Sequence, residues 1–99
     1  MKVLVSEGRG LKRTPARIPT TLLLESGNCR SEHQATIVDL SREGVQVQVA
    51  VPLMCGDSVG VELDEHRANA RRGHVVWVEP LWPRREWRAG VKLVDHIRL

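Results

Sequence analysis

The chain has 99 residues but no phenylalanine and no tyrosine, so its three tryptophans are its only aromatic side chains. Barrels that bind single-stranded nucleic acid usually present aromatic stacking platforms along a basic groove. The composition therefore argues against nucleic acid as the partner, although a small basic barrel of that class stays an alternative. The net charge of +3, from 15 Lys and Arg against 12 Asp and Glu, favours an anionic partner without identifying it.

Paired cysteines, metal-ligand clusters and long apolar runs are also lacking. Cys29 and Cys55 form no CxxC pair, which is typical of reduced thiols in a cytosol. The four histidines have no metal-ligand spacing, so we expect no metal site. The apolar run 3–5 is too short for a signal-peptide core, and no stretch has the length of a transmembrane helix. We therefore expect a soluble cytoplasmic protein without membrane insertion.

The common catalytic motifs are absent from the sequence as well. It contains no GxSxG, no P-loop, no HExxH, and no nucleophile with a base at motif spacing. The length suits a single domain. The sequence therefore predicts a binding module that needs no cofactor, and not an enzyme.

Apolar residues alternate with polar ones through most of the chain after residue 17. The clearest period of two is in residues 45–51, where valines alternate with Gln46, Gln48 and Ala50. Similar runs, separated by turn residues, lie at 18–25, 34–40, 59–63, 70–79 and 87–93. Six short strands without a long helix predict an all-β domain over residues 18–99, a small six-stranded antiparallel barrel. Residues 1–17, which contain Gly8 and Gly10, are predicted to form a flexible N-terminal arm.

Two short motifs carry the main functional signal. The first is RxxxR, at Arg13-Thr14-Pro15-Ala16-Arg17, and the second is DxSxxG, from Asp39 to Gly44. Alone, the first could be a solvated basic loop and the second a simple turn between strands. In this order, each followed by a strand-like run, they resemble the PilZ family, bacterial domains that bind the second messenger cyclic di-GMP. The resemblance extends from about Lys12 to Asp95.

The chemistry of cyclic di-GMP fits the residue types in the two motifs. Arg13 and Arg17 can each bind guanine O6 and N7 or a phosphate through two hydrogen bonds, and can also stack on a base. The Asp39 carboxylate can accept from the N–H donors of guanine, and the Ser41 hydroxyl can donate to the ligand. Gly44 allows a positive φ or a close approach of the backbone to the ligand. These five residues are the predicted ligand-binding residues.

The resemblance also implies a barrel architecture and a protein partner that responds to ligand binding. It implies a barrel over which the arginine arm closes, and a downstream protein that senses the bound state. Gly73–Trp77 and Ala89–Leu93 resemble late strands of the family, although Leu93 or Val94 replaces a usual phenylalanine. Since the chain stops at Leu99, we expect little or no C-terminal helix. A PilZ-like adaptor that acts by protein contact without nucleotide is a further alternative.

Several single residues have two interpretations each. In the family, a basic residue before RxxxR favours a stacked pair of ligands, and Lys12 holds that position here, although it could equally be a solvated lysine. Trp77 could stack on a guanine or have a structural role, whereas Trp87 is predicted to belong to the core. Alternation places Ile37 and Asp39 on one face of their strand, so that Asp39 projects from the barrel unless a bulge intervenes.

Overall fold

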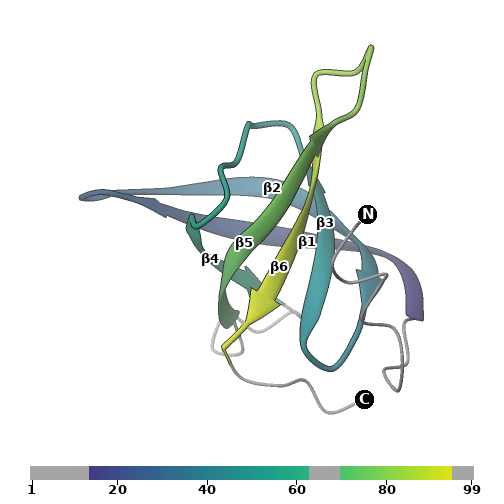
Figure 1. Ribbon diagram of the computed structural model, residues 1–99, viewed down its shortest axis with the longest axis horizontal. Coiled ribbons are helices and arrows are strands. Elements are labelled where there is room, and N and C mark those ends of the chain that lie inside the picture. The colour runs from purple at the N-terminus through teal and green to yellow at the C-terminus, as the bar shows by residue number, and fades with distance from the viewer. Residues whose placement is uncertain (1–13, 63–69, 95–99) are drawn as a thin grey trace.

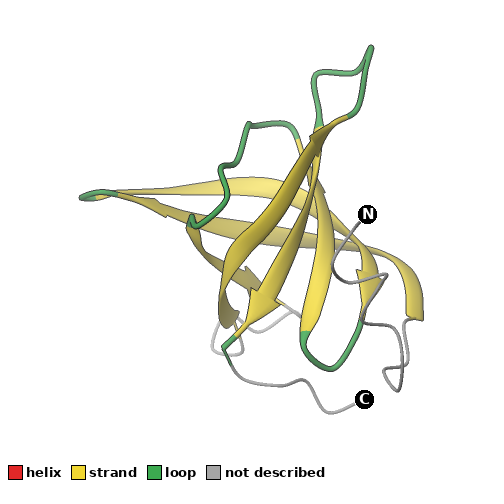
Figure 2. Cartoon of the chain, in the orientation of Figure 1, coloured by secondary structure: helices red, strands yellow, loops and turns green. Residues whose placement is uncertain are grey.

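The computed structural model describes residues 14–62 and 70–94, which form an antiparallel barrel (Figure 1). Its strands are β1 (Thr14–Ser26), β2 (Cys29–Leu40), β3 (Gly44–Val49), β4 (Ser58–Glu62), β5 (Ala70–Pro80) and β6 (Trp87–Leu93). The barrel closes in the order β1-β2-β3-β6-β5-β4. Between the strands, the described residues form only turns and loops (Figure 2). The predicted six-stranded all-β barrel is therefore confirmed.

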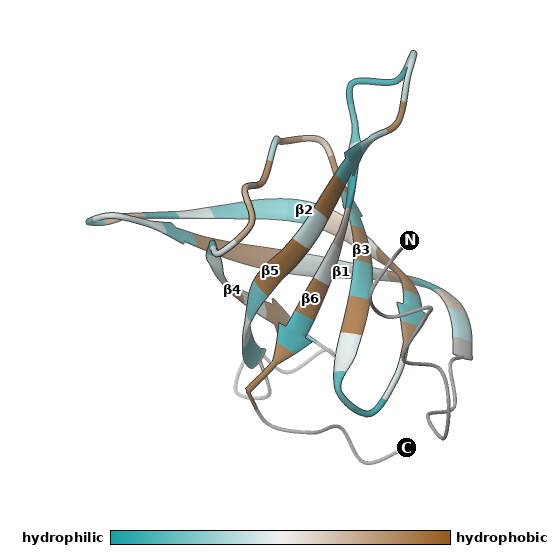
Figure 3. Ribbon diagram, in the orientation of Figure 1, coloured by the Kyte–Doolittle hydropathy of each residue, from teal (hydrophilic) through white to brown (hydrophobic). Residues whose placement is uncertain are grey.

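The interior of the barrel is aliphatic. Along β3, hydrophobic and hydrophilic residues alternate (Figure 3), and Val45, Val47 and Val49 are buried. Each such side chain contributes about 1.5–3 kcal/mol when it leaves water. No aromatic side chain of the described part belongs to the buried core. Trp87, predicted to be a core residue, is only half-buried, so that prediction is wrong; its position at the first residue of β6 leaves it at the end of the barrel.

Strands β1 and β2 are longer than the runs 18–25 and 34–40 predicted for them. They pair from Thr14 opposite Leu40 to Ser26 opposite Cys29, and the far part of this hairpin extends away from the barrel (Figure 1). Residues 26–32 are exposed, so they carry no apolar alternation that would identify a strand. Gly27 has a φ of 61° at the first position of the two-residue loop, as in a type II′ turn.

Three strand pairs contain an irregularity where an extra residue shifts the register. The shifts lie between Pro15 and Ile18, between Ile37 and Asp39, and between Val75 and Trp77. An extra residue reverses which face the following side chains occupy. Each shift therefore changes the direction of a predicted functional residue or of its neighbour.

The shift in β2 corrects one prediction. Ile37 and Asp39 were expected to share a face, but Ile37 is fully buried while Asp39 pairs with Gln46, which alternates with the buried valines of β3. The bulge at Val38 is the physical reason, because it adds one residue between them. Asp39 thus faces outward while Ile37 faces the core.

The described residues contain no helix, and hence no apolar helix that could cross a bilayer.

Candidate functional site

Sheet register places two of the predicted site residues, Asp39 and Trp77, in one row. Asp39 pairs with Pro15 of β1 on one side and with Gln46 of β3 on the other. Gln46 pairs in turn with Gly90 of β6, and Gly90 pairs with Trp77 of β5. This Asp39–Trp77 row, meaning Asp39, Gln46, Gly90 and Trp77, crosses four neighbouring strands. Adjacent strands are about 4.8 Å apart, so the row spans about 14 Å of backbone.

Gln46 lies beside Asp39 and is joined to it. The Gln46 side chain is only 5% exposed although it faces away from the core. Its Nε2 donates to Asp39 Oδ2 over 3.3 Å. A carboxylate held in this way has less freedom to rotate, so the row presents Asp39 in a defined direction.

Trp77 occupies the other end of the row and lies on the backbone of Gly90. A Cβ added at Gly90 would lie 2.5 Å from Trp77 Cε2 and 2.7 Å from Cδ1, and closer still to Nε1. Only glycine therefore allows the indole to lie here. The neighbouring Val78 packs against the core, so Trp77 faces outward, and it is half-buried. This geometry agrees with either interpretation of Trp77, since the half-buried indole still has part of its surface in solvent.

The DxSxxG segment forms the turn between β2 and β3. Ser41 N donates to Gly44 O over 2.9 Å, and Ser41 Oγ lies 3.2 Å from both the N and the O of Gly44. Leu93 N donates to Glu43 O over 2.8 Å and joins the turn to β6. Ser41 is 4% exposed, so in this structure its hydroxyl closes the turn.

Gly44 was expected either to adopt a positive φ or to let the backbone approach the ligand closely. It does not have a positive φ. Among the described residues, only Gly27 and Gly56 have positive φ values. Gly44 is instead the buried first residue of β3, where its N–H and C=O close the turn with Ser41. A close approach of its backbone to a ligand stays a prediction.

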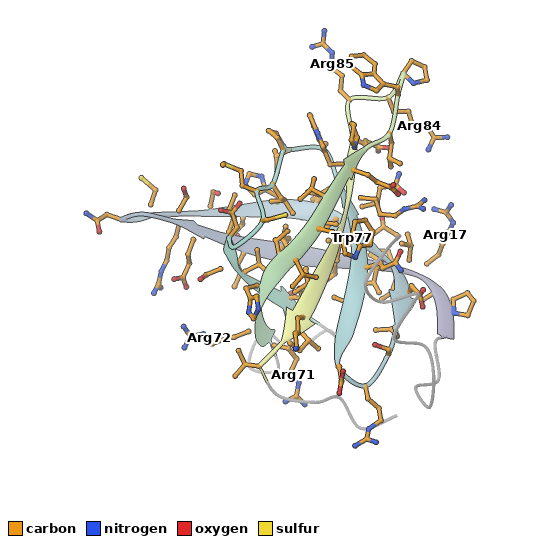
Figure 4. The ribbon with its side chains drawn as sticks, viewed as in Figure 1. Arg17, Arg71, Arg72, Trp77, Arg84 and Arg85 are labelled. Atoms are coloured by element: carbon orange, nitrogen blue, oxygen red, sulfur yellow. The ribbon has the colours of Figure 1, made fainter. Side chains whose placement is uncertain are left out.

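Arg17 lies in β1, within the register shift opposite β2. Its neighbours Ala16 and Ile18 pack against the core, so Arg17 between them is exposed on the outside of the barrel (Figure 4). It stands two residues after Pro15, the partner of Asp39. Of the arm expected over residues 1–17, residues 14–17 belong to β1, and residues 1–13, with Lys12 and Arg13, lie outside the described residues.

Sequence reasoning did not identify Gln46 and Gly90. A signal for Gln46 was available, because a four-residue turn from Ser41 to Gly44 that pairs Leu40 with Val45 also pairs Asp39 with Gln46. No comparable signal identified Gly90. The pairing of Gly90 with Trp77 depends on the register shift after Val75, and no residue type in the sequence indicates that shift.

A hollow lies on the side of the barrel opposite to the Asp39–Trp77 row. It measures about 670 Å³ and is lined by residues of β1, β4 and β5, including Arg72 and His74. Strand β4 is three strands from β3 in either direction around the barrel, and Figure 4 shows Arg72 and Arg17 on opposite sides. At its rim, Glu25 lies 3.8 Å from Arg30, which offsets that positive charge. This hollow does not combine a carboxylate, an arginine and an indole as the outer face near Asp39 does.

The outer face of this barrel thus carries an exposed arginine on β1, a carboxylate on β2 that accepts from Gln46, and a half-buried indole on β5. A family model described as the PilZ domain matches residues 8–98, so the chain belongs to the PilZ family. PilZ domains are generally binding modules for cyclic di-GMP. A search among curated proteins finds no match to this chain.

Proposed function

We propose that this protein is a cyclic di-GMP receptor that changes conformation on binding and signals to a partner protein. One observation carries the proposal: in a PilZ barrel, Asp39 and Trp77 lie in a single row, with Arg17 exposed beside the strand partner of Asp39. The ligand offers two phosphates and two guanines. The row and the arginines supply an acceptor, a stacking surface and bidentate donors for these groups.

Each residue has a distinct role in the proposed complex. Asp39 accepts from N1–H and N2–H of a guanine, and Arg17, with Arg13, binds phosphate or the O6 and N7 edge. Trp77 stacks on a base. Ser41 keeps the turn closed and donates to the ligand only when its hydroxyl rotates away from the Gly44 carbonyl.

The conformational change belongs to the segment that carries Lys12 and Arg13. When it closes over the row, the ligand contacts the closed state far better than the open one, and this difference shifts the equilibrium. The switch therefore requires no rearrangement of the barrel itself.

The hairpin between β5 and β6 is the surface best suited to a protein partner. It projects from the strand that carries Trp77, and Arg84 and Arg85 extend from it (Figure 4). Trp82, in the same loop between β5 and β6, is 85% exposed. Its base is fixed, since Leu81 N donates to Glu86 O over 2.9 Å and Gln48 Nε2 donates to Glu86 Oε2 over 2.8 Å. Tryptophan and arginine are the residues that contribute most often to binding energy at protein interfaces.

Calorimetric titration with cyclic di-GMP, GTP and a short DNA oligomer tests the proposal. We expect saturable binding of cyclic di-GMP and at least tenfold weaker binding of the other two, because neither offers two guanines on a compact ring. Binding of DNA alone would indicate the nucleic-acid barrel. Binding of none of them would indicate an adaptor that acts by protein contact.

A further inference from the structure

Gln46 is an outward-facing amide that is almost completely covered. Gln48, two residues later on the same face of β3, is more exposed and donates to Glu86 Oε2 over 2.8 Å. Gln46 is 5% exposed and donates to Asp39 Oδ2 over 3.3 Å. Two glutamines of one strand thus make two separate contacts, and only that of Gln46 reaches the candidate site.

The surroundings of Gln46 restrict where its amide can point. On one side stands Asp39, and on the other stands Gly90, over whose backbone the Trp77 indole lies. Gln46 therefore stands between the strand of the carboxylate and the strand covered by the indole, and its amide reaches the carboxylate. Because a buried amide without a hydrogen bond is unfavourable, Gln46 favours the Asp39 orientation that keeps this bond.

We infer that Gln46 is a positioning residue that sets the base specificity of the site, by holding the Asp39 carboxylate in the direction that accepts from guanine. This inference rests on the proposed function. Guanine presents N–H donors at N1 and N2, whereas adenine presents an acceptor at N1 and has no amino group at C2. A carboxylate fixed in one orientation rejects adenine, because two acceptors then face each other. A carboxylate that lacks the bond to Gln46 turns away more easily, which weakens this repulsion and reduces the discrimination.

Two substitutions at Gln46 separate the hydrogen bond from packing. Gln46→Met removes the donor and keeps an unbranched side chain of similar length, while Gln46→Leu removes the amide and keeps most of the volume. Gln48→Leu is the matched control, since it changes the same residue type on the same face of the same strand. Circular dichroism and thermal unfolding establish that each variant is folded before binding is measured.

The readout is the ratio of the dissociation constants for cyclic di-AMP and cyclic di-GMP in each protein. We expect this ratio to fall by about tenfold in both Gln46 variants, as the loss of a hydrogen bond to a charged group implies, and to stay unchanged in Gln48→Leu. A merely structural role of Gln46 would weaken both ligands equally.

The outcomes distinguish this inference from the proposed function. If the wild-type protein binds neither cyclic dinucleotide, the proposed function fails and the inference fails with it. If the wild type prefers cyclic di-GMP and both Gln46 variants keep that preference, or lose affinity for both ligands alike, the inference is wrong while the proposed function stands. A wild type that does not discriminate between the two ligands also overturns the inference alone.

Discussion

Gly90 is the residue on which the position of Trp77 depends. Any side chain at this position would occupy the space of the indole, since the Cβ alone comes within 2.5 Å of Trp77 Cε2. The backbone there has no positive φ, so the requirement for glycine is one of space and not of conformation. A half-exposed tryptophan is thus held flat against the sheet by the absence of a side chain on the neighbouring strand.

Gly90→Ala should displace the Trp77 indole, weaken cyclic di-GMP binding by about tenfold and destabilise the fold by about 1–3 kcal/mol, because overpacking forces neighbouring groups to move. Gly60→Ala is the control, since its added Cβ would come no closer than 3.4 Å to the flexible side chain of Leu23. Denaturant unfolding and calorimetry measure both effects. Equal behaviour of the two variants would contradict this account of Gly90.

Arg13→Ala and Arg17→Ala should each weaken cyclic di-GMP binding by at least tenfold, since each removes charge-assisted hydrogen bonds to the ligand. Stability should change little for Arg17→Ala, because this side chain is exposed. Arg30→Ala, in the β1–β2 hairpin with 84% of its side chain exposed, is the control. Calorimetric titration of each variant with cyclic di-GMP measures the affinity. Wild-type affinity in both Arg13→Ala and Arg17→Ala would show that these arginines do not bind the ligand.

At the scale of elements, the sequence was most informative where one face of a strand is buried. Residues 45–51 alternate strictly, and β3 was found there because its valines line the barrel interior. The outer part of β2, residues 29–33, was not predicted, since the end of a hairpin that extends into solvent has no buried face to impose a pattern.

The bulges could not be predicted from local sequence. Nothing in Thr36-Ile37-Val38-Asp39 marks an extra residue, because a bulge depends on how two strands pair over their whole length. The residues of the DxSxxG motif and the outward direction of Asp39 could therefore be predicted, but the bulge that places Ile37 on the opposite face could not. The contacts of Gln46 and Gly90 depend on the same pairing, which is why they emerged only from the structure.

At the N-terminal end of β1, we expect backbone amides of residues 1–13 to exchange more slowly with solvent when cyclic di-GMP is bound. The ligand would hold Arg13, and with it the segment around it, against the barrel. Hydrogen exchange followed by mass spectrometry, with and without ligand, measures this protection, and peptides from β3 serve as an internal control. Equal exchange in both states would show that this segment does not close over the site.

For the molecule as a whole, the aliphatic core leaves its tryptophans available for other contacts. All three lie outside the fully buried core: Trp77 in the site row, Trp82 at a projecting hairpin tip and Trp87 at the end of the barrel. In this chain, which has no phenylalanine or tyrosine, the aromatic residues thus lie nearer the surface than the centre of the core. This division agrees with a barrel whose function is to bind.

The measurement that tests the central claim most directly is calorimetric titration of the full chain with cyclic di-GMP at low salt, beside the Asp39→Ala variant. The account predicts saturable binding that Asp39→Ala weakens by at least tenfold, with a stoichiometry of two ligands per chain if Lys12 stabilises a stacked pair. Saturation at one ligand would overturn the role of Lys12 and leave the other site residues in place. No binding by the wild-type protein, or equal binding by wild type and Asp39→Ala, would contradict the assignment of this face of the barrel as the ligand site.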